Sequence, residues 1–296
     1  MTACDKCPRE CLADRSKVPG VCGMTDEITV AKAALHFWEE PCISGTNGSG
    51  TVFFSGCPLK CVYCQNAKIS RELFGAKVTA PELMRTFDML IEQGAHNINL
   101  VSPTHFASRL ADILKAYKSP VPVVYNSSGY EKVETLRLLE GLVDIYLPDI
   151  KYVDASVSRK YSGAEDYFDF AARAVLEMNR QTGVLQMNET GLAVKGLLVR
   201  HLILPGNVSQ TVKVLQWMHA NLPADTAVSL MSQYTPLGEA KKIAPLNRRI
   251  SIKEYNRASD ALLTLGFVNG YIQEPGAAGK EYIPDFDLAG IKKGAD

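Results

Sequence analysis

Three cysteines in a short loop are the residues of this sequence best suited to metal chemistry. Cys57, Cys61 and Cys64 have the spacing C-x3-C-x2-C and follow the apolar run Thr51–Ser55. Cysteine thiolates are the usual ligands of iron–sulfur clusters, so three of them can hold three corners of a 4Fe–4S cluster. The fourth iron then lacks a protein ligand, and an open metal position is where a substrate or cofactor binds. A zinc site or a set of buried free cysteines is the alternative.

Four further cysteines near the start of the chain form a second candidate metal site. Cys4, Cys7, Cys11 and Cys22 lie in a short segment that is too small to form a core without a staple. Four thiolates suit either tetrahedral zinc or a second iron–sulfur cluster, and the spacing does not decide between them. Reduced thiols on a flexible tail are the third interpretation. Cys42 is left over, and we expect it to be a small buried side chain.

The composition is typical of a globular protein in a reducing compartment. Of the 296 residues, 46% are hydrophobic and 22% are charged, and the 32 basic residues equal the 32 acidic ones. This balance argues against a dedicated nucleic-acid-binding protein. The sequence shows neither a signal peptide nor an apolar run of the roughly 20 residues that span a bilayer. We therefore expect a cytoplasmic protein that binds no nucleic acid and no membrane, with cysteines that bind metal.

From Thr51 onward, short β-rich runs alternate with helical patterns. The predicted strands are 51–55, 97–101, 121–125, 143–147, 197–204 and 227–231, with 267–272 as a last strand or an edge extension. The predicted helices are 81–93, 106–117, 132–139, 164–181, 208–221 and 252–265. Such alternation is typical of right-handed βαβ units around a parallel sheet.

Six such units predict an α/β fold, a partial (β/α)6 TIM-like barrel with a Cys-rich N-terminal extension. A doubly wound open sheet is the alternative. The extension and its connector cover residues 1–50, and the barrel covers residues 51–275. Residues 276–296 form a C-terminal tail, which we expect to be mobile or folded over the barrel mouth.

Polar side chains follow the predicted strands at the places where a barrel has its active site. In parallel barrels, catalytic groups gather at the carboxyl ends of the strands. The candidates there are Ser102, Thr104, Asn126, Ser128, Asp149, Lys151 and Arg200. Each also has a bland explanation, as a helix cap, a turn residue or half of an ion pair. Their shared face of the barrel nevertheless favours a site. For His105 and His201, which are near it, structural roles are expected.

The Cys57–Cys64 loop, with aromatic Tyr63 before its last cysteine, resembles the signature of the radical S-adenosylmethionine (radical SAM) superfamily. The resemblance runs from about Thr51 to Gln273 and is closest to the pyruvate formate-lyase-activating enzyme group. Four segments carry the closer match: Phe53–Cys57, Cys64–Asn66, Leu147–Tyr152 and Val199–Gly206. By this resemblance, Tyr63 is expected to be a cofactor-binding residue.

The resemblance implies a reaction that begins with S-adenosyl-L-methionine (SAM). SAM binds the open iron of the 4Fe–4S cluster through its amino and carboxylate groups. An electron from the reduced cluster breaks a carbon–sulfur bond and yields methionine and a 5′-deoxyadenosyl radical. That radical takes a hydrogen atom from the substrate. The cofactors perform the difficult step, and the protein supplies position and electrostatics.

The resemblance also implies roles for the strand-end residues. Asn126, Ser128 and Lys151 match positions near the polar groups of SAM. Arg200 matches a cofactor contact, and its planar, permanently charged group suits a carboxylate. Asp149 would pair with Lys151 or face the sulfonium.

Two features depart from the activating enzymes. Ser102-Pro-Thr104 lies where relatives often have a Gly-Gly-Glu stretch that holds the amino group of SAM, so a hydroxyl or a backbone carbonyl would replace the carboxylate. A histidine expected near Tyr234 is absent.

The resemblance suggests a protein substrate, such as a glycine in a glycyl-radical enzyme, and a flavodoxin or ferredoxin-type reductant. Radical modification of another protein or of a small molecule is the alternative enzymatic function. A non-catalytic iron–sulfur or zinc module for electron transfer is the alternative from another class.

Overall fold

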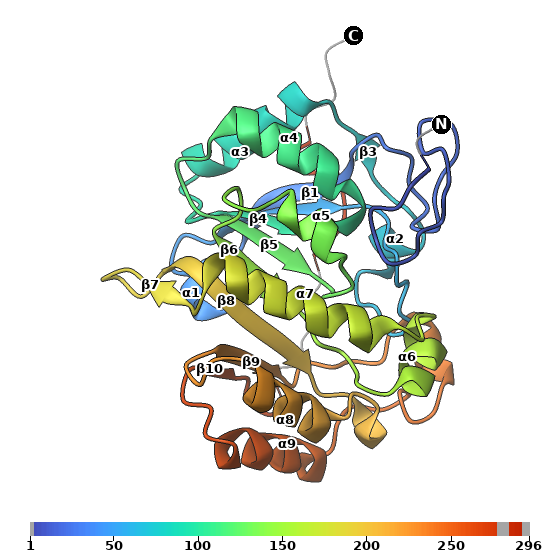
Figure 1. Cartoon of the computed structure of the whole chain (residues 1–296), viewed down its shortest axis with the longest axis vertical. Helices are drawn as coiled ribbons and strands as arrows, with labels where there is room; N and C mark the ends of the chain where they lie inside the picture. Colours follow the sequence, from blue (N-terminus) through green and yellow to red (C-terminus); the bar gives the residue numbers. More distant parts are fainter. Residues whose placement is uncertain (1–2, 277–283, 292–296) are drawn as a thin grey trace.

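The computed structural model describes residues 3–276 and 284–291. Its centre is a mostly parallel sheet with the strand order β10-β9-β8-β6-β5-β4-β2-β1-β3 (Figure 1). The order runs from β10 to β3 without returning, so within the described residues the sheet forms an open, partial barrel. The predicted α/β partial barrel is confirmed.

The predicted elements are present with small shifts at their ends. The parallel strands are β2 (Ser49–Phe54), β4 (Ile98–Val101), β5 (Val123–Ser127), β6 (Ile145–Pro148), β8 (Ala193–Leu202), β9 (Ala227–Met231) and β10 (Gly270–Ile272). The predicted helices are α3 (Ala80–Glu92), α4 (Ala107–Tyr117), α5 (Val133–Arg137), α7 (Tyr167–Thr182), α8 (Thr211–Asn221) and α9 (Ile252–Thr264). Figure 1 shows these helices on one side of the sheet, where they cover the outer face of the barrel.

The structure also contains elements that the sequence pattern did not predict. The antiparallel strands are β1 (Thr29–His36), β3 (Ala76–Lys77) and β7 (Gln186–Met187). The additional helices are α1 (Pro41–Ser44), α2 (Ala67–Ser70) and α6 (Ala155–Ser162), with short 3-10 turns η1 (Thr104–Phe106), η2 (Pro205–Asn207) and η3 (Gly238–Lys242). Among the described residues, no helix is long and apolar enough to cross a membrane.

Helix α3 illustrates how the local sequence sets an outer helix in place. Thr79 accepts a hydrogen bond from the backbone of Glu82, and the Glu82 side chain accepts one from the backbone of Thr79. This capping box satisfies two amide groups that a helix start leaves free. Leu83, Phe87 and Leu90, at helical spacing, are fully buried against the sheet. Capping and one apolar stripe therefore fix both the start of α3 and its orientation.

Alternate residues of each strand face the inside of the barrel, as the pleat requires. In β2, Val52 and Phe54 belong to the core under the helices, while Phe53 packs in a separate inner cluster. Inward positions near the carboxyl ends of the other strands hold polar side chains, including Asn126 and Arg200. The pleat thus turns a row of strand-end residues toward one space.

The connector before the barrel is folded into the sheet and the barrel base. β1 pairs with β2 along six residue pairs. Helix α1 then places Cys42 and Ile43 against Val124, Ile145 and Leu198, which lie in the strands around the amino-terminal end of the barrel. Cys42 is 2% exposed, which confirms the predicted small buried side chain. The connector therefore closes the base of the barrel.

Residues 284–291, from the predicted C-terminal tail, lie along β1. The amide of Ala33 donates to the carbonyl of Ala289 at 2.8 Å, and the amide of Leu288 donates to the carbonyl of Ala31 at 3.1 Å. Phe286 is 4% exposed and packs edge-on against Phe53. The rest of the predicted tail, residues 277–283 and 292–296, lies outside the described residues.

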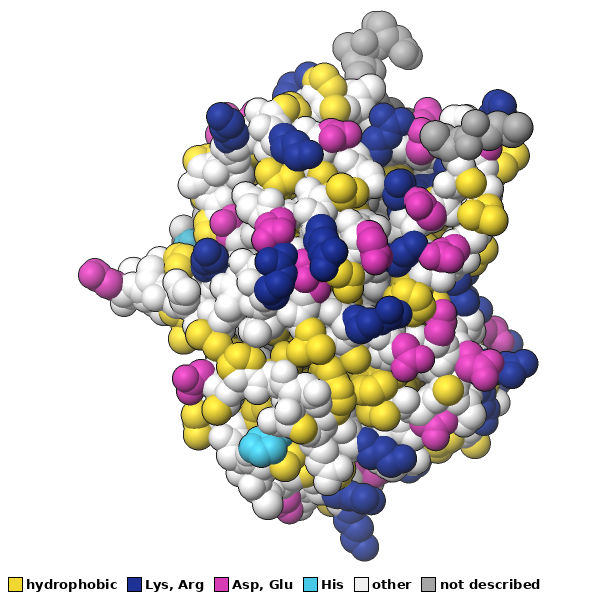
Figure 2. Space-filling model, in the orientation of Figure 1, with side chains coloured by type: hydrophobic (Ala, Val, Ile, Leu, Met, Phe, Trp, Pro, Cys, Tyr) yellow, Lys and Arg dark blue, Asp and Glu magenta, His cyan; other side chains and the backbone are white. Residues whose placement is uncertain are grey.

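Figure 2 shows basic and acidic side chains interspersed over the face that it presents. This agrees with the equal numbers of the two in the sequence.

Candidate cluster and cofactor site

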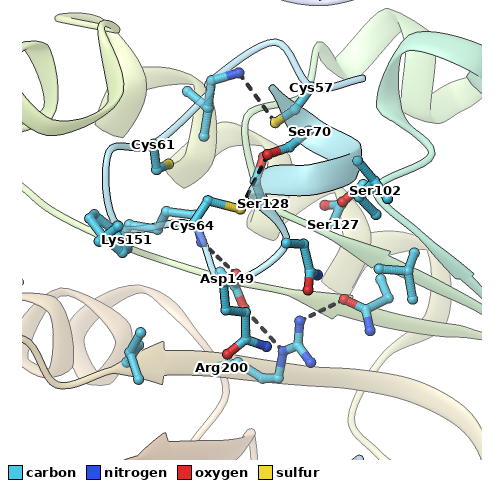
Figure 3. Close-up of a pocket in the computed structure, with 18 of the residues that line it drawn as sticks. Cys57, Cys61, Cys64, Ser70, Ser102, Ser127, Ser128, Asp149, Lys151 and Arg200 are labelled. Carbon is cyan, nitrogen blue, oxygen red and sulfur yellow. Dashed lines mark hydrogen bonds and ion pairs between the residues drawn. The ribbon is translucent and has the colours of Figure 1, made fainter. Parts of the chain in front are cut away.

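One pocket lies at the carboxyl ends of the parallel strands, where the sequence predicts the site (Figure 3). It encloses about 1340 Å³, its open mouth included. Ten of the predicted site residues line it: Cys57, Cys61, Tyr63, Cys64, Ser102, Asn126, Ser128, Asp149, Lys151 and Arg200.

The loop after β2 presents its three thiols to this pocket. The sulfur of Cys57 accepts a hydrogen bond from the amide of Leu59 at 3.4 Å. The sulfur of Cys61 accepts one from the hydroxyl of Ser162 at 2.9 Å, and that of Cys64 accepts one from Ser70 at 3.4 Å. Donors aimed at sulfur stabilise thiolate ligands and tune the potential of an iron–sulfur cluster. Ser162 and Ser70 were not identified from the sequence, because nothing in their neighbourhood marks them.

Two thiols of the loop, those of Cys57 and Cys61, need a neighbouring positive charge to ionise. Burial raises the pKa of Cys57 to about 12 and also raises the pKa of Cys61. Buried thiolates need a positive charge beside them, which bound iron provides.

The donor set fits a cluster with one open iron. Within residues 3–276 and 284–291, no three His, Cys, Asp or Glu side chains are arranged around a single metal ion. A 4Fe–4S cluster does not require that arrangement, because each thiolate binds a different iron. Three thiols on one loop, each with sulfur on the pocket side, match three corners of such a cluster.

Tyr63 packs the cysteine loop against two other tyrosines of the barrel. Its hydroxyl receives a hydrogen bond from the hydroxyl of Tyr152 at 2.5 Å, and its ring meets those of Tyr152 and Tyr234 edge-on. Tyr63 is only 8% exposed. The aromatic residue of the motif therefore holds the loop against the barrel as well as lining the pocket.

A chain of charged side chains lies across the pocket floor (Figure 3). Asp149 accepts from Lys151 Nζ at 2.6 Å and from Arg200 Nε at 3.0 Å, and Arg200 Nη2 donates to Asn126 Oδ1 at 2.6 Å. Burial opposes ionisation of Asp149, but Lys151 and Arg200 outweigh it and hold the pKa of Asp149 below its usual value. The same pairing keeps Lys151 charged despite its burial, since Asp149 raises the pKa of Lys151.

Glu39 is a member of this network that the sequence analysis missed. It comes from the connector before α1, and its Oε2 lies 3.0 Å from Arg200 Nη1. Its Oε1 accepts from Asn99 and Asn126, each at 3.2 Å. Burial raises the pKa of Glu39, and the charge of Arg200 opposes that shift. Three donors thus converge on one carboxylate directly below the pocket.

Thr104 is the one predicted cofactor residue that the structure does not place at the pocket. It is 2% exposed, and its hydroxyl donates to Glu131 Oε1 at 2.5 Å. Thr104 begins the η1 turn after β4, and its side chain bonds Glu131 instead of lining the pocket. Glu131 is fully buried, which raises the pKa of Glu131 to about 8. Ser102, two residues earlier, does line the pocket and has a left-handed backbone with φ of 58°.

The two histidines near the site are structural, as expected. His201 is hydrogen-bonded to the carbonyl of Ile150 at 2.6 Å and to Thr211 at 3.0 Å, and His105 is hydrogen-bonded to the carbonyl of Ser55 at 2.7 Å. Burial lowers the pKa of His105 to about 3 and that of His201 to about 4. Both rings are therefore neutral and fixed in place at neutral pH.

Comparisons with known proteins agree with this geometry. Residues 51–184 match the family model of the radical SAM superfamily. Over 264 aligned residues, the chain is 28% identical to the uncharacterized protein MJ0674 of Methanocaldococcus jannaschii. The alignment covers 86% of this chain and 72% of that protein.

Solved structures share the fold at low sequence identity. Methylornithine synthase (PylB) is 18% identical with a TM-score of 0.50, over 73% of this chain and 60% of that one. The hydrogenase maturase HydG of Carboxydothermus hydrogenoformans is 16% identical with a TM-score of 0.50, over 79% of this chain and 56% of that one. SuiB of Streptococcus suis, bound to S-adenosylmethionine, is 12% identical with a TM-score of 0.50, over 74% of this chain and 48% of that one. The chain thus spans between about half and three fifths of these structures.

The cofactors of this superfamily are a 4Fe–4S cluster and SAM, and the three-cysteine loop and the pocket floor fit both. Residues 51–184, a little under half of the chain, thus match the radical SAM superfamily, and the partial barrel is the fold shared with the solved structures.

Proposed function

We propose that this radical SAM enzyme uses reductive cleavage of SAM to take a hydrogen atom from a protein substrate, with a glycine of a glycyl-radical enzyme as the first candidate. The observation that supports the chemistry is that the three-cysteine loop and the Arg200 network line the same pocket. The segments Phe53–Cys57 and Val199–Gly206, which resemble the activating enzymes, support the choice of substrate.

The residues of the chain have distinct tasks in this proposal. Cys57, Cys61 and Cys64 would hold the 4Fe–4S cluster through their thiolates. When bound and reduced, the cluster would supply the electron for reductive cleavage of SAM.

Arg200 binds the carboxylate of SAM. Its contacts with Asp149, Glu39 and Asn126 engage three of its five N–H groups and fix its plane. Two N–H groups stay available for a carboxylate, which suits the forked geometry of arginine.

Lys151 and Asp149 set the charge beside the cluster. Lys151 lies close enough to Cys61 to act on that thiol electrostatically. A fixed cation there stabilises a thiolate ligand without taking part in the bond changes. Ser128 and Asn126 add neutral polar groups for the amino acid part of SAM.

In this proposal, Ser102 takes over the role of the Gly-Gly-Glu stretch that the chain lacks. At Ser102 the backbone turns left-handed, and its amide donates to the carbonyl of Asn126 at 2.9 Å. The hydroxyl of Ser102, at the pocket wall, is the group we assign to the amino group of SAM.

The donor of electrons is a flavodoxin or ferredoxin-type protein. Radical modification of another protein or of a small molecule is the alternative for the substrate. An electron-transfer module without catalysis is disfavoured by the cofactor pocket beside the cluster loop, which such a module does not need.

Isotope transfer tests the substrate directly. The reconstituted protein is reduced, given SAM, and mixed with a glycyl-radical enzyme carrying deuterated glycine. Deuterium in the recovered 5′-deoxyadenosine and a glycyl-radical signal by electron paramagnetic resonance (EPR) are expected. The same enzyme with ordinary glycine is the control. Cleavage of SAM with neither label transfer nor a glycyl radical would refute this substrate and favour the alternative.

A further inference from the structure

The pocket has a second wall, formed by the end of β9 and the segment that follows it. The residues of this β9 wall are Met231, Gln233, Tyr234, Thr235 and Leu237. Tyr234 packs edge-on against Tyr63 of the cluster loop, with ring centroids 6.3 Å apart, and its hydroxyl donates to the carbonyl of Leu246 at 2.7 Å. The β9 wall is therefore held beside the cluster loop, and none of the contacts assigned to SAM uses it.

The β9 wall offers no charge to a ligand. Among the described residues that line the pocket, the charged side chains, apart from the cluster cysteines, are Asp149, Lys151 and Arg200. These three pair with one another and belong to the part of the pocket assigned to SAM. A charged group bound at the β9 wall would lose its water without meeting an opposite charge, which costs free energy. The β9 wall therefore favours an uncharged substrate group.

Two backbone amides fix the orientation of the Gln273 side chain. Gln273 follows directly on β10, and its backbone amide donates to the carbonyl of Leu230 in β9 at 3.0 Å. Its side-chain Oε1 accepts from the amides of Ser232 at 2.9 Å and Gln233 at 3.0 Å. Because only the oxygen of a side-chain amide accepts, Gln273 Nε2 must be its other branch. That nitrogen donates to Gln233 Oε1 at 3.1 Å.

The orientation of Gln233 follows from that of Gln273. The oxygen of Gln233 faces a donor, so the other branch of this side chain is the nitrogen with its two N–H groups. Gln233 Nε2 lies 3.9 Å from the sulfur of Met231, which is a weak acceptor. At least one N–H group of Gln233 is therefore left for a group bound in the pocket.

Thr235 supplies a second polar group to the same wall. Its hydroxyl oxygen is buried and has no hydrogen-bond partner among the described residues. Buried polar groups of folded proteins are nearly always paired, so a ligand that supplies the missing partner explains this hydroxyl. Gln233 and Thr235 together offer N–H and O–H donors to a neutral acceptor.

We propose that Gln233 donates a hydrogen bond to an uncharged carbonyl oxygen of the substrate, the backbone carbonyl beside a glycine within a peptide. Gln273 is a positioning residue, which acts by holding Gln233. The inference rests on the proposed function and names the substrate group that the β9 wall recognises. A glycine within a peptide has uncharged groups on both sides, whereas a free amino acid brings two charges that this wall does not pair.

Isotope transfer from two probes tests the class of substrate. The reconstituted, reduced protein receives SAM with either free dideuterated glycine or a mixture of end-blocked heptapeptides, randomised around a central dideuterated glycine. Deuterium in 5′-deoxyadenosine is expected from the peptides and not from free glycine. Equal or faster transfer from free glycine, or cleavage of SAM without transfer from either probe, would overturn the proposal. No 5′-deoxyadenosine from the wild type would instead refute the proposed function.

Substitutions of the two glutamines test their separate roles. In Gln233→Glu a carboxylate oxygen replaces the N–H donor, and Gln233→Met removes the donor without adding a charge. In Gln273→Glu the donor to Gln233 Oε1 is lost, so the Gln233 amide is free to turn its oxygen toward the pocket. Each variant should raise the apparent KM for the peptide mixture by at least about tenfold, and more than it lowers kcat.

Gln210→Glu is the matched control. Gln210 Oε1 also accepts from two backbone amides, those of Asp154 at 2.8 Å and Val153 at 3.1 Å, but Gln210 does not line the pocket. This variant should change the apparent KM by less than about threefold. Apparent KM values for the Gln233 variants equal to that of the control would overturn the role of Gln233. A Gln273→Glu variant that loses stability in urea but keeps the wild-type KM would overturn the positioning role of Gln273.

Discussion

Replacing Glu39 by glutamine tests whether a residue from the connector positions the cofactor-binding arginine. Glu39 accepts from Arg200, Asn99 and Asn126. The amide of the E39Q variant has one acceptor oxygen, and its own N–H groups face other donors.

The expected magnitudes follow from these contacts. Removing one partner of a buried ion pair costs about 3–5 kcal/mol, so the free energy of unfolding should fall by about 3 kcal/mol. A hydrogen bond to a charged group contributes about 1.5–3 kcal/mol. If holding Arg200 in place for SAM costs about 1.5 kcal/mol more in E39Q than in the wild type, the free energy of SAM binding weakens by that amount. The Kd for SAM then rises about tenfold.

Isothermal titration of SAM into the reconstituted, unreduced protein measures Kd, and urea unfolding measures stability. Glu177→Gln is the matched control. Glu177 is 6% exposed and pairs with Arg180 at 2.8 Å, but it lies on α7 and does not line the pocket. E177Q should leave the Kd within about threefold. Equal Kd values for E39Q and the wild type, or equal changes in E39Q and E177Q, would refute the positioning role of Glu39.

Two further predictions concern residues outside the pocket. Phe286→Ala should lower the free energy of unfolding by about 3 kcal/mol, because Phe286 is buried against Phe53, whereas Val268→Ala, at an 80% exposed position, should change it by less than about 0.5 kcal/mol. Similar urea midpoints for the two variants would show that residues 284–291 do not stabilise the barrel. Burial raises the pKa of Glu131 from 4.5 to about 8, so in this pH range the folded state holds a proton that the unfolded state has released. Between these values, the stability of the wild type relative to Glu131→Gln should therefore fall as pH rises, by up to about 1.4 kcal/mol per pH unit, and then level off. A difference independent of pH from 4.5 to 8 would mean that Glu131 is ionised in the folded protein.

Local patterns predicted the barrel and most of its pocket. The cluster loop is defined by the spacing of Cys57, Cys61 and Cys64, and its place after an apolar run sets it at a strand end. Arg200 and Asn126 were found because inward-facing positions at the carboxyl ends of parallel strands converge. These inferences use only neighbours in sequence and the rules of parallel sheets.

Contacts between distant segments could not be predicted in the same way. Glu39 meets Arg200 across 161 positions, and only the folding of α1 into the barrel base brings them together. The hydroxyl of Thr104 bonds Glu131 from the start of a 3-10 turn, and residue types do not reveal that contact. The hydrogen bond from the amide of Cys57 to the carbonyl of Cys22 likewise depends on how the N-terminal extension packs against the barrel.

Formation of 5′-deoxyadenosine by the purified protein tests the central claim most directly. The wild-type chain is reconstituted anaerobically and reduced with dithionite, its reduced cluster is verified by EPR, and SAM is then added. We expect 5′-deoxyadenosine and methionine in equal amounts from the wild type and Cys42→Ser, and none from Cys61→Ala. An intact, reduced cluster that binds SAM without cleaving it would contradict the account.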